Sequence, residues 1–592
     1  MMVTAAAAMP ASTLAAPSTQ HLPASAIRAG GAAEAPVDNA SFIPGPDALP
    51  APPFAGALRI APTQMQTRPA IEQALIGGRD ASRFPGVTLA FVSDGGVLVP
   101  VERGEMVRET VAGRTPSYWR VIPQFGRVWR DVRDDGWARA AFPLMLVNDT
   151  ENHAHQGLAT FLYKDGAVSA LRFQFVQQNG PYLVKPHFVA WGVAAIEATP
   201  IDGKIADSQR TAAIAELAAR LPAKPLAELA ASLPAGALAG FGGPLLPKWQ
   251  VQTALVRDGT LYYGDSATPY GPYPYPLEMR FGVRSITKSV VAPLALLRLA
   301  EVFGPWVLNL HVGDYVPGLD SKWQRIRFRD AADMATGFGG VGSLKTQPND
   351  PFDGYLEGDY DAWYTAPSHA EKLAQINRHL SPFPWEPGVV MRYRDQDYYL
   401  LGAALDAFLK TQRGKNADLW EFVQAEVLRP IGIAHAPAVH TREPNDRDGI
   451  VWANAGYYPT LDDLAKIALL YRDHGAHGGR QILHRQLTTD LLAAKDALRK
   501  TGDASMGGVG PNGEAIELYH WGFHYVPYVG SASGKLHYLP TMSGSGENQV
   551  VIYPNGLISI RTAKASQLPP GEKASSDEGP VTLRAVDRLA PF

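Results

Sequence analysis

The chain has 592 residues, no cysteine and a formal net charge of −3. This length exceeds what one hydrophobic core usually supports, so we expect two or more domains. The absence of a basic excess argues against nucleic-acid binding, and the absence of cysteine excludes disulfides, thiolate metal sites and a cysteine nucleophile. Arg298 and Glu301 interrupt the longest apolar run, 290–308, which therefore indicates a buried helix and no membrane span.

Residues 1–50 consist mostly of Ala, Pro, Ser and Gly, with few side chains able to build a core, and are predicted to be disordered. The first 16 residues lack the basic start of a secretion signal. They are either the remains of an export signal or part of a disordered Ala/Pro-rich tail. We expect a periplasmic or secreted protein, with a cytoplasmic location as the alternative.

Residues 51–200 have a strand-like pattern and predict a β-rich accessory domain. Two hairpins are expected, in each of which apolar segments flank a turn that contains Gly: 87–92 with 97–101, and 157–163 with 170–176. His153 and His155 would point to one face of a strand, as a metal site requires. No third ligand has a suggestive spacing, so surface-loop histidines are the preferred interpretation, and we assign this domain neither a metal nor a chemistry.

Residues 201–245 are predicted to form a helical linker, because two Ala-rich stretches precede a Gly- and Pro-rich segment. A second domain is expected over 246–592. It begins with a hairpin around 257–259, continues with helices to about 495 and ends with three strands and an amphipathic stretch at 581–589. Strands at both ends with helices between them predict one α/β sheet completed by the two ends of this domain.

Ser285 and Lys288 form the only Ser-x-x-Lys of the chain and stand at the head of an apolar run. Residues three apart share a face of a helix. A hydroxyl, an amine and backbone N–H groups without intrahelical partners would then meet, which are the parts of an activated serine nucleophile. Alone, such a short motif also arises by chance.

The segment 279–289 resembles the nucleophile segment of the serine β-lactamase and penicillin-binding-protein superfamily, in its class C branch. That branch includes esterases, D-amino-acid peptidases and hydrolases of 6-aminohexanoate (nylon) oligomers. Further matches follow in the order of the family, at 312–317, 326–337, 393–402, 430–433 and 455–465. The resemblance covers 246–592 and implies a β-lactamase-like fold, an antiparallel sheet with flanking helices and a helical subdomain, joined to the N-terminal β-rich domain.

The resemblance implies that Ser285 attacks an acyl carbon and forms an acyl-enzyme that water later clears. Lys288 would exchange a proton with Ser285 after burial has lowered its pKa. Tyr393 would be the second proton-transfer group and needs a neighbouring ammonium, because a free phenol has a pKa of about 10. This chemistry requires neither a metal nor an organic cofactor.

Two positions depart from the family pattern. Asp395 stands where the family often has Asn, so this substrate-binding position can accept hydrogen bonds but adds negative charge beside the nucleophile. The family's third motif, Lys-Thr-Gly or His-x-Gly ahead of a late strand, corresponds to 542–548 in this chain. This segment lacks the Lys or His at its head, which in β-lactamases helps to bind the substrate carboxylate. Gly544 and Gly546 are expected to line the substrate site or to form a tight turn, and the two interpretations are compatible. The backbone N–H groups of Ser285 and Ser545 would form the oxyanion hole.

The segment 349–361 carries five carboxylates and no basic residue. It is a solvated loop, a wall that selects a cationic or amide-rich substrate, or an oxygen-ligand Ca²⁺ site. The aromatic residues Tyr355, Tyr360 and Trp363 would line an acyl pocket or anchor the loop.

The leading hypothesis is a serine hydrolase that acts on a small-molecule or oligomeric ester or amide. A β-lactamase, a D,D-carboxypeptidase or a D-aminopeptidase is the first alternative, and a non-catalytic sensor or scaffold the second. The sequence leaves the oligomeric state open.

Overall fold

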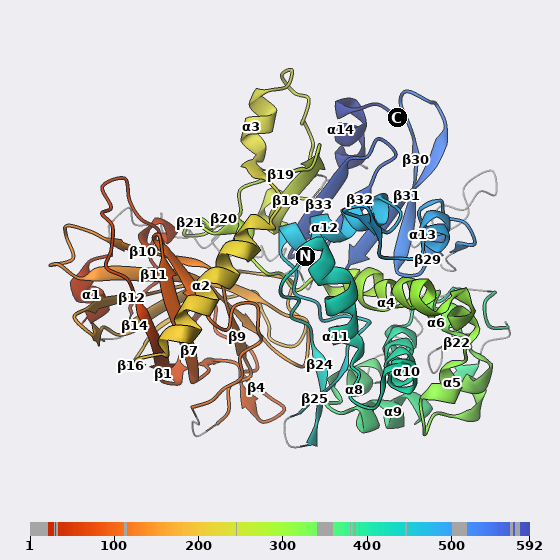
Figure 1. The fold of residues 1–592 in the computed structure, drawn as a ribbon, viewed down its shortest axis with the longest axis horizontal. Helices are drawn as coiled ribbons and strands as arrows, with labels where there is room; N and C mark the ends of the chain where they lie inside the picture. Colours follow the sequence, from red (N-terminus) through yellow and green to blue (C-terminus); the bar gives the residue numbers. More distant parts are fainter. Residues whose placement is uncertain are drawn as a thin grey trace, which may run out of the picture.

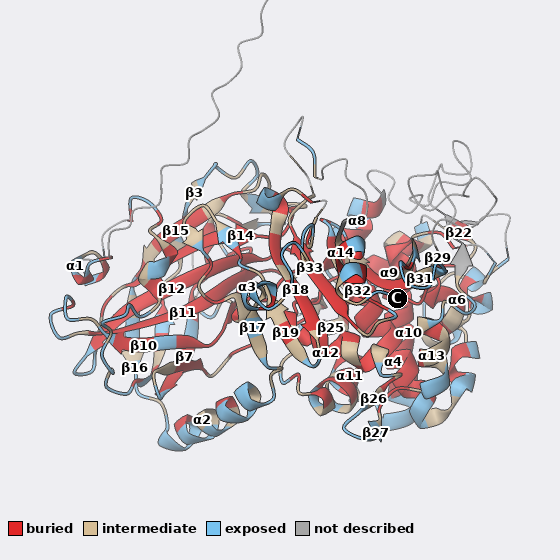
Figure 2. Cartoon of the chain, turned by 90° about the horizontal axis from the view of Figure 1, so that it is seen from above, coloured by how far each residue is buried: buried red, intermediate tan, exposed pale blue. Residues whose placement is uncertain are grey.

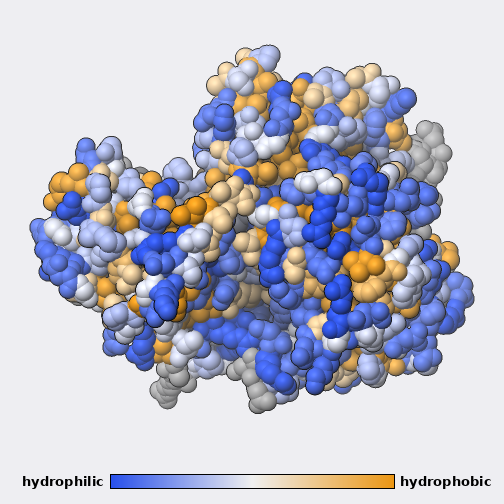
Figure 3. Space-filling view, in the orientation of Figure 1, coloured by the Kyte–Doolittle hydropathy of each residue, from blue (hydrophilic) through white to orange (hydrophobic). Residues whose placement is uncertain are grey.

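The computed structural model contains two sheet-based units that lie side by side (Figure 1). It describes residues 22–28, 30, 33–111, 115–243, 245–339, 359–378, 380–382, 386–389, 391–444, 447–499, 518–566, 568, 572–574 and 581–592. No described helix is long and apolar enough to cross a membrane. Polar side chains cover much of the face in Figure 3, and apolar ones are more frequent on the upper lobe with α3 and α14.

The N-terminal unit is built on a twelve-stranded antiparallel sheet. Its main path runs β16-β1-β7-β8-β10-β11-β12-β14-β15-β3, with β9 and β13 beside it. The strands are β1 (Ala55–Ile60), β3 (Gln66–Arg68), β7 (Val87–Asp94), β8 (Val97–Pro100), β9 (Arg120–Pro123), β10 (Gly126–Arg130), β11 (Ala138–Val147), β12 (His155–Lys164), β13 (Ala167–Val168), β14 (Leu171–Gln178), β15 (Val189–Ala194) and β16 (Ile196–Thr199). The predicted β-rich unit and both predicted hairpins, β7–β8 and β12–β14, are confirmed.

The prediction of disorder is wrong for the described residues between 22 and 50. They contain helix α1 (Ala24–Arg28) and a 3-10 turn, η1 (Asn39–Phe42). Ile27 packs against Leu162 of β12, Phe42 joins a core cluster with residues from both units, and Asn39 Nδ2 donates to Thr268 Oγ1 at 2.9 Å. The few apolar residues of this segment complete the cores of other elements, which composition alone does not reveal. Residues 1–21 lie outside the described residues.

The segment between the two units contains α2 (Gly203–Ala218) and α3 (Leu226–Ala231), close to the predicted helices. Between them, β17 (Ala223–Pro225) pairs in parallel with β19 (Thr260–Tyr263). This part of the predicted linker is therefore an edge strand of the second sheet.

The second unit is built on a nine-stranded sheet in the order β17-β19-β18-β33-β32-β31-β30-β29-β28. The remaining strands are β18 (Gln250–Arg257), β28 (Leu498–Arg499), β29 (Leu518–His520), β30 (Phe523–Val529), β31 (Leu536–Gly544), β32 (Asn548–Ile552) and β33 (Ile558–Ala563). The early strand β18 pairs antiparallel with the late strand β33, so the two ends of the domain complete one sheet, as the sequence predicts.

Helices cover both faces of this sheet. The core of one face joins α4 (Thr287–Phe303), α10 (Asp395–Arg413) and α12 (Leu461–Arg472) to Val550 and Ile560. The core of the other face joins α3 and α14 (Val581–Leu589) to Val551 and Leu539. The other helices are α5 (Val312–Tyr315), α6 (Phe328–Ala332), α8 (Asp359–Thr365), α9 (His369–Arg378), α11 (Leu419–Val423) and α13 (Arg485–Leu492). Buried residues run through both sheets and through α4, which confirms the predicted buried helix (Figure 2).

Candidate active site

Ser285 lies in a 3-10 turn, η4 (Arg284–Ile286), directly before α4. The helical geometry places Lys288 on the same side, and its Nζ donates to Ser285 Oγ at 3.0 Å. Ser285 is half-buried, whereas only 1% of Lys288 is exposed. The hydroxyl and the amine are thus in contact at the edge of the core.

Three further groups surround the amine of Lys288. Its Nζ donates to Asn454 O at 2.9 Å, forms an ion pair with Asp395 Oδ1 and lies 4.8 Å from the centre of the Tyr393 ring. Burial disfavours the charged amine, but Asp395 and Tyr393 outweigh burial, so the pKa of Lys288 is raised. The expectation of a lowered pKa is wrong, because the sequence does not show how closely Asp395 approaches Lys288.

Asp395 begins α10 and is almost fully buried. Its Oδ1 contacts Lys288, and its Oδ2 accepts a hydrogen bond from Tyr360 Oη at 2.6 Å. Both carboxylate oxygens are therefore engaged within the protein. The negative charge that Asp395 brings to the neighbourhood of Ser285 is balanced by Lys288.

Tyr393 precedes α10 and packs with the rings of Tyr519 and His524. Burial raises its pKa, and hydrogen bonds from Ser285 and Lys288 together with the Lys288 charge only partly oppose this effect. Tyr393 is consequently a neutral phenol near pH 7. The structure brings this phenol together with Ser285, Lys288 and Asp395.

The end of β31 lies against the η4 turn that carries Ser285. A Cβ atom added to Gly544 would overlap Val283 O and lie 3.2 Å from Ser285 N. The next residue, Ser545, is exposed, and its carbonyl accepts a hydrogen bond from Asn548 Nδ2 at 2.8 Å. Gly546 has a φ of 89° in the turn that follows. The glycines thus serve both a close approach and a tight turn.

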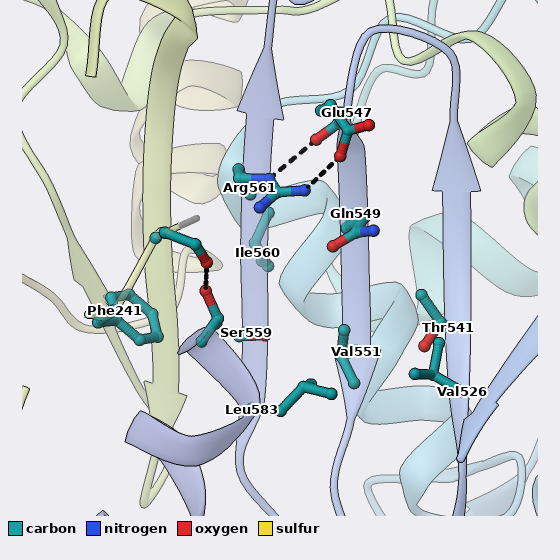
Figure 4. A pocket seen from close by; sticks show the side chains of 13 residues that line it. Phe241, Val526, Thr541, Glu547, Gln549, Val551, Ser559, Ile560, Arg561 and Leu583 are labelled. Atoms are coloured by element: carbon teal, nitrogen blue, oxygen red, sulfur yellow. Dashed lines mark hydrogen bonds and ion pairs between the residues drawn. The ribbon is translucent and has the colours of Figure 1, made fainter. Parts of the chain in front are cut away.

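Arg561 of β33 holds this turn from the neighbouring strand. Its Nε donates to Glu547 O and its Nη2 to Glu547 Oε2, both at 2.9 Å (Figure 4). The two residues line a pocket on the sheet face that α14 covers, together with Phe241 and Leu583 (Figure 4). Sequence reasoning missed Arg561, since nothing near it in the sequence indicates this contact.

Tyr360 and Trp363 lie on α8 and are buried, whereas Tyr355 and residues 349–358 lie outside the described residues. The Tyr360 and Trp363 rings are 5.6 Å apart. Buried Lys372 donates through Nζ to Trp363 O and Tyr364 O, each at 3.0 Å. These contacts anchor α8, and Tyr360 reaches the site through Asp395. Within the described ranges, no group of three His, Asp or Glu residues could hold a metal ion.

His153 and His155 are not on the surface, so the surface-loop interpretation is wrong. His153 and His155 are fully buried with ring centres 4.6 Å apart. The His155 ring also packs against Trp119 and Phe188. Burial lowers the pKa of His155, which is therefore neutral at physiological pH.

The Beta-lactamase family model matches residues 250–552, more than half of the chain. This chain belongs to the Beta-lactamase family. The resemblance and the fold class predicted from the sequence are confirmed, and the matched span contains the whole Ser285, Lys288, Tyr393 and Asp395 cluster.

Several solved structures are similar to this member of the Beta-lactamase family. One is a Bacillus anthracis protein assigned as a 6-aminohexanoate-dimer hydrolase (18% identity, TM-score 0.41, 58% of this chain and 79% of that chain covered). A second is an octameric penicillin-binding protein homologue from Pyrococcus abyssi (17% identity, TM-score 0.39, 58% of this chain and 74% of that chain covered). A third is a family VIII carboxylesterase (14% identity, TM-score 0.38, 57% of this chain and 90% of that chain covered). No curated protein matches this chain.

Proposed function

We propose that this Beta-lactamase-family chain is a serine hydrolase that cleaves a carboxylic ester or amide through an acyl-enzyme on Ser285. The observation that carries the proposal is the contact of Lys288 Nζ with Ser285 Oγ at 3.0 Å, made while the same amine contacts Asp395 and Tyr393. A nucleophile, a proton carrier and an acceptor are thereby in one chain of contacts.

The raised pKa values of Lys288 and Tyr393 indicate the route by which Ser285 loses its proton. Near pH 7 Lys288 is an ammonium and Tyr393 a phenol, because both pKa values are raised. The Asp395 carboxylate is then the acceptor of the cluster. As Ser285 Oγ bonds to the acyl carbon, Lys288 takes the hydroxyl proton and passes one of its own to Asp395 Oδ1.

The cluster gives up one proton when the leaving group departs. Tyr393 donates its hydroxyl proton to the leaving alcohol or amine and is reprotonated by Lys288, which recovers a proton from Asp395. In deacylation, a water molecule attacks the ester carbon and gives its proton to the cluster, which restores the hydroxyl of Ser285 as the acyl–oxygen bond breaks. Each group ends in its starting protonation state, and no cofactor enters these steps.

The developing oxyanion would be bound by the backbone N–H groups of Ser285 and Ser545. The close approach of Gly544 to Ser285 N supports this assignment, since it brings the β31 end against the nucleophile turn. One such donor contributes about 10²- to 10³-fold to kcat in serine hydrolases.

For the substrate, we propose an uncharged or cationic acyl group, in a linear amide of the 6-aminohexanoate type or in an ester. Met542, at the head of the third motif, is fully buried and apolar, so it offers no cation for a substrate carboxylate. This feature disfavours β-lactams and D,D-peptides as substrates.

The test is a substrate panel assayed with wild type and Ser285→Ala. The panel contains p-nitrophenyl esters, aminohexanoate oligomers, D-amino-acid amides and nitrocefin. Turnover and fluorophosphonate labelling by wild type only would support the proposal. Activity that persists in Ser285→Ala would refute the mechanism. Nitrocefin turnover without ester or amide cleavage would favour a β-lactamase, and the absence of any labelling would favour a sensor or scaffold.

A further inference from the structure

The β-rich unit reaches the nucleophile turn through one buried side chain. Asn152 precedes β12 and is fully buried. Its Oδ1 accepts a hydrogen bond from Arg284 N at 2.6 Å, and its Nδ2 donates to Tyr457 O at 3.2 Å. Asn152 therefore binds the residue directly before Ser285 and, at the same time, a segment that follows Asn454, the carbonyl partner of Lys288.

Arg284 needs such support because its backbone is left-handed. Its φ is 53°, a strained conformation that residues other than glycine rarely adopt. Besides the backbone contact with Asn152, its guanidinium donates through Nη2 to Gly180 O at 2.6 Å and lies 3.9 Å from Glu151 Oε2. The β-rich unit thus holds both the backbone and the side chain of Arg284.

A second amide extends this contact along the chain. Asn179 Nδ2 donates to Gly282 O at 2.8 Å and to Asn152 O at 2.7 Å, while its Oδ1 accepts from Ala154 N. Gly282 has no room for a Cβ atom, which would lie 2.5 Å from Asn179 Nδ2. Gln156 Nε2 makes the corresponding bond to Arg280 O at 2.7 Å.

Successive residues of the segment 280–284 consequently bond alternately to the β-rich unit and to the second unit. The segment's even-numbered residues bond through their backbone to amide side chains of the β-rich unit. Its odd-numbered residues bond to the second unit, Phe281 N to Pro459 O at 3.0 Å and Val283 N to Tyr457 O at 3.4 Å. The segment that leads to Ser285 is thus held by bonds to both units.

We propose that Asn152 is a positioning residue of the active site, assisted by Asn179, and that the β-rich unit is part of the catalytic centre. The inference rests on the proposed function of Ser285. By holding Arg284 in its left-handed conformation, Asn152 sets the positions of Ser285 Oγ and of the Ser285 N–H. Neither Asn152 nor Asn179 touches the reacting atoms.

The experiment measures fluorophosphonate labelling rates and steady-state ester or amide hydrolysis by the full chain. We expect Asn152→Ala to lower kcat and the labelling rate by about 10- to 100-fold with little change in KM, since a small displacement of reacting groups costs up to about 10²-fold. Asn152→Asp keeps an acceptor for Arg284 N and should recover part of this loss.

Asn39→Ala is the matched control. Asn39 is also a fully buried amide that bonds to the second unit, but there its partners are Thr268 Oγ1, Gly271 O and Pro272 O, and none of these belongs to the segment 280–288. The Asn39→Ala substitution should lower thermal stability and leave kcat unchanged. Equal labelling rates for folded Asn152→Ala and Asn39→Ala would overturn the inference. If Asn152→Ala does not fold, Asn179→Ala enters the same comparison with the same refuting result.

The two proposals fail in different ways. A wild-type chain that is neither labelled nor active refutes the function proposed for Ser285. A wild-type chain that is labelled, with rates unaffected by the asparagine substitutions, refutes only the positioning role.

Discussion

Gly544→Ala tests the close contact between β31 and the nucleophile turn. The new methyl group would overlap Val283 O and lie 3.2 Å from both Ser285 N and Ile286 N. All three neighbours are backbone atoms, so no side chain can rotate to make room. The strand end and the turn must move apart, and the two proposed oxyanion donors move apart with them.

The size of the effect follows from this displacement. Relief of such an overlap requires a separation on the order of 1 Å, and a misplacement of that size costs about 10²-fold in rate. Loss of one oxyanion donor costs a similar factor, about 10²- to 10³-fold in kcat, or about 2.7–4 kcal/mol of transition-state stabilisation. We therefore expect a fall of at least about 10²-fold in kcat for Gly544→Ala.

The assay is pre-steady-state acylation by a p-nitrophenyl ester, with thermal unfolding recorded in parallel. Gly203→Ala is the control, because Gly203 has open space around it and begins the surface helix α2. Gly203→Ala should acylate at the wild-type rate. A folded Gly544→Ala variant that also acylates at the wild-type rate would show that the β31 end does not form the oxyanion site.

Two further predictions concern buried charges. Asp395→Asn removes the carboxylate that raises the pKa of Lys288, so this pKa should fall and the relay should lose its acceptor. The pH–rate profile should then show a lower kcat/KM at pH 7 that increases towards alkaline pH, and a profile identical to wild type would exclude the relay. Burial lowers the pKa of Lys372 well below its usual range, so below the unfolded pKa of about 10.4 the unfolded chain binds more proton at this amine than the folded chain does. Wild type should therefore lose stability from about pH 10 to pH 7 relative to Lys372→Met, whose side chain does not titrate. Chemical denaturation at both pH values measures this difference, and an equal difference at both would contradict the lowered pKa of Lys372.

The features that the sequence predicts well are local. The two hairpins follow from alternating apolar residues around turns with glycine, and α4 follows from its apolar run. Ser285 and Lys288 meet because residues three apart share a helix face, so their contact needs no tertiary information.

The features that the sequence does not predict depend on distant segments. Asn152 lies 132 residues before Arg284, so no local pattern links the two. A polar residue next to two histidines is typical of a surface loop. The raised pKa of Lys288 depends on its buried ion pair with Asp395, which lies 107 positions later in the sequence. Sequence spacing alone does not predict that these two side chains are in contact. The packing of Phe42 depends likewise on distant residues, since its core cluster contains residues of both units.

The alternating bonds of the segment 280–284 have a consequence for folding. The geometry around Ser285 cannot form until the two units have folded and docked, since Asn152 of one unit and Tyr457 of the other both bond to this segment and to each other. Contacts so distant in sequence form late, because long loops must close first. Recovery of hydrolysis during refolding should therefore lag behind recovery of secondary structure, which makes enzymatic activity a reporter of domain docking.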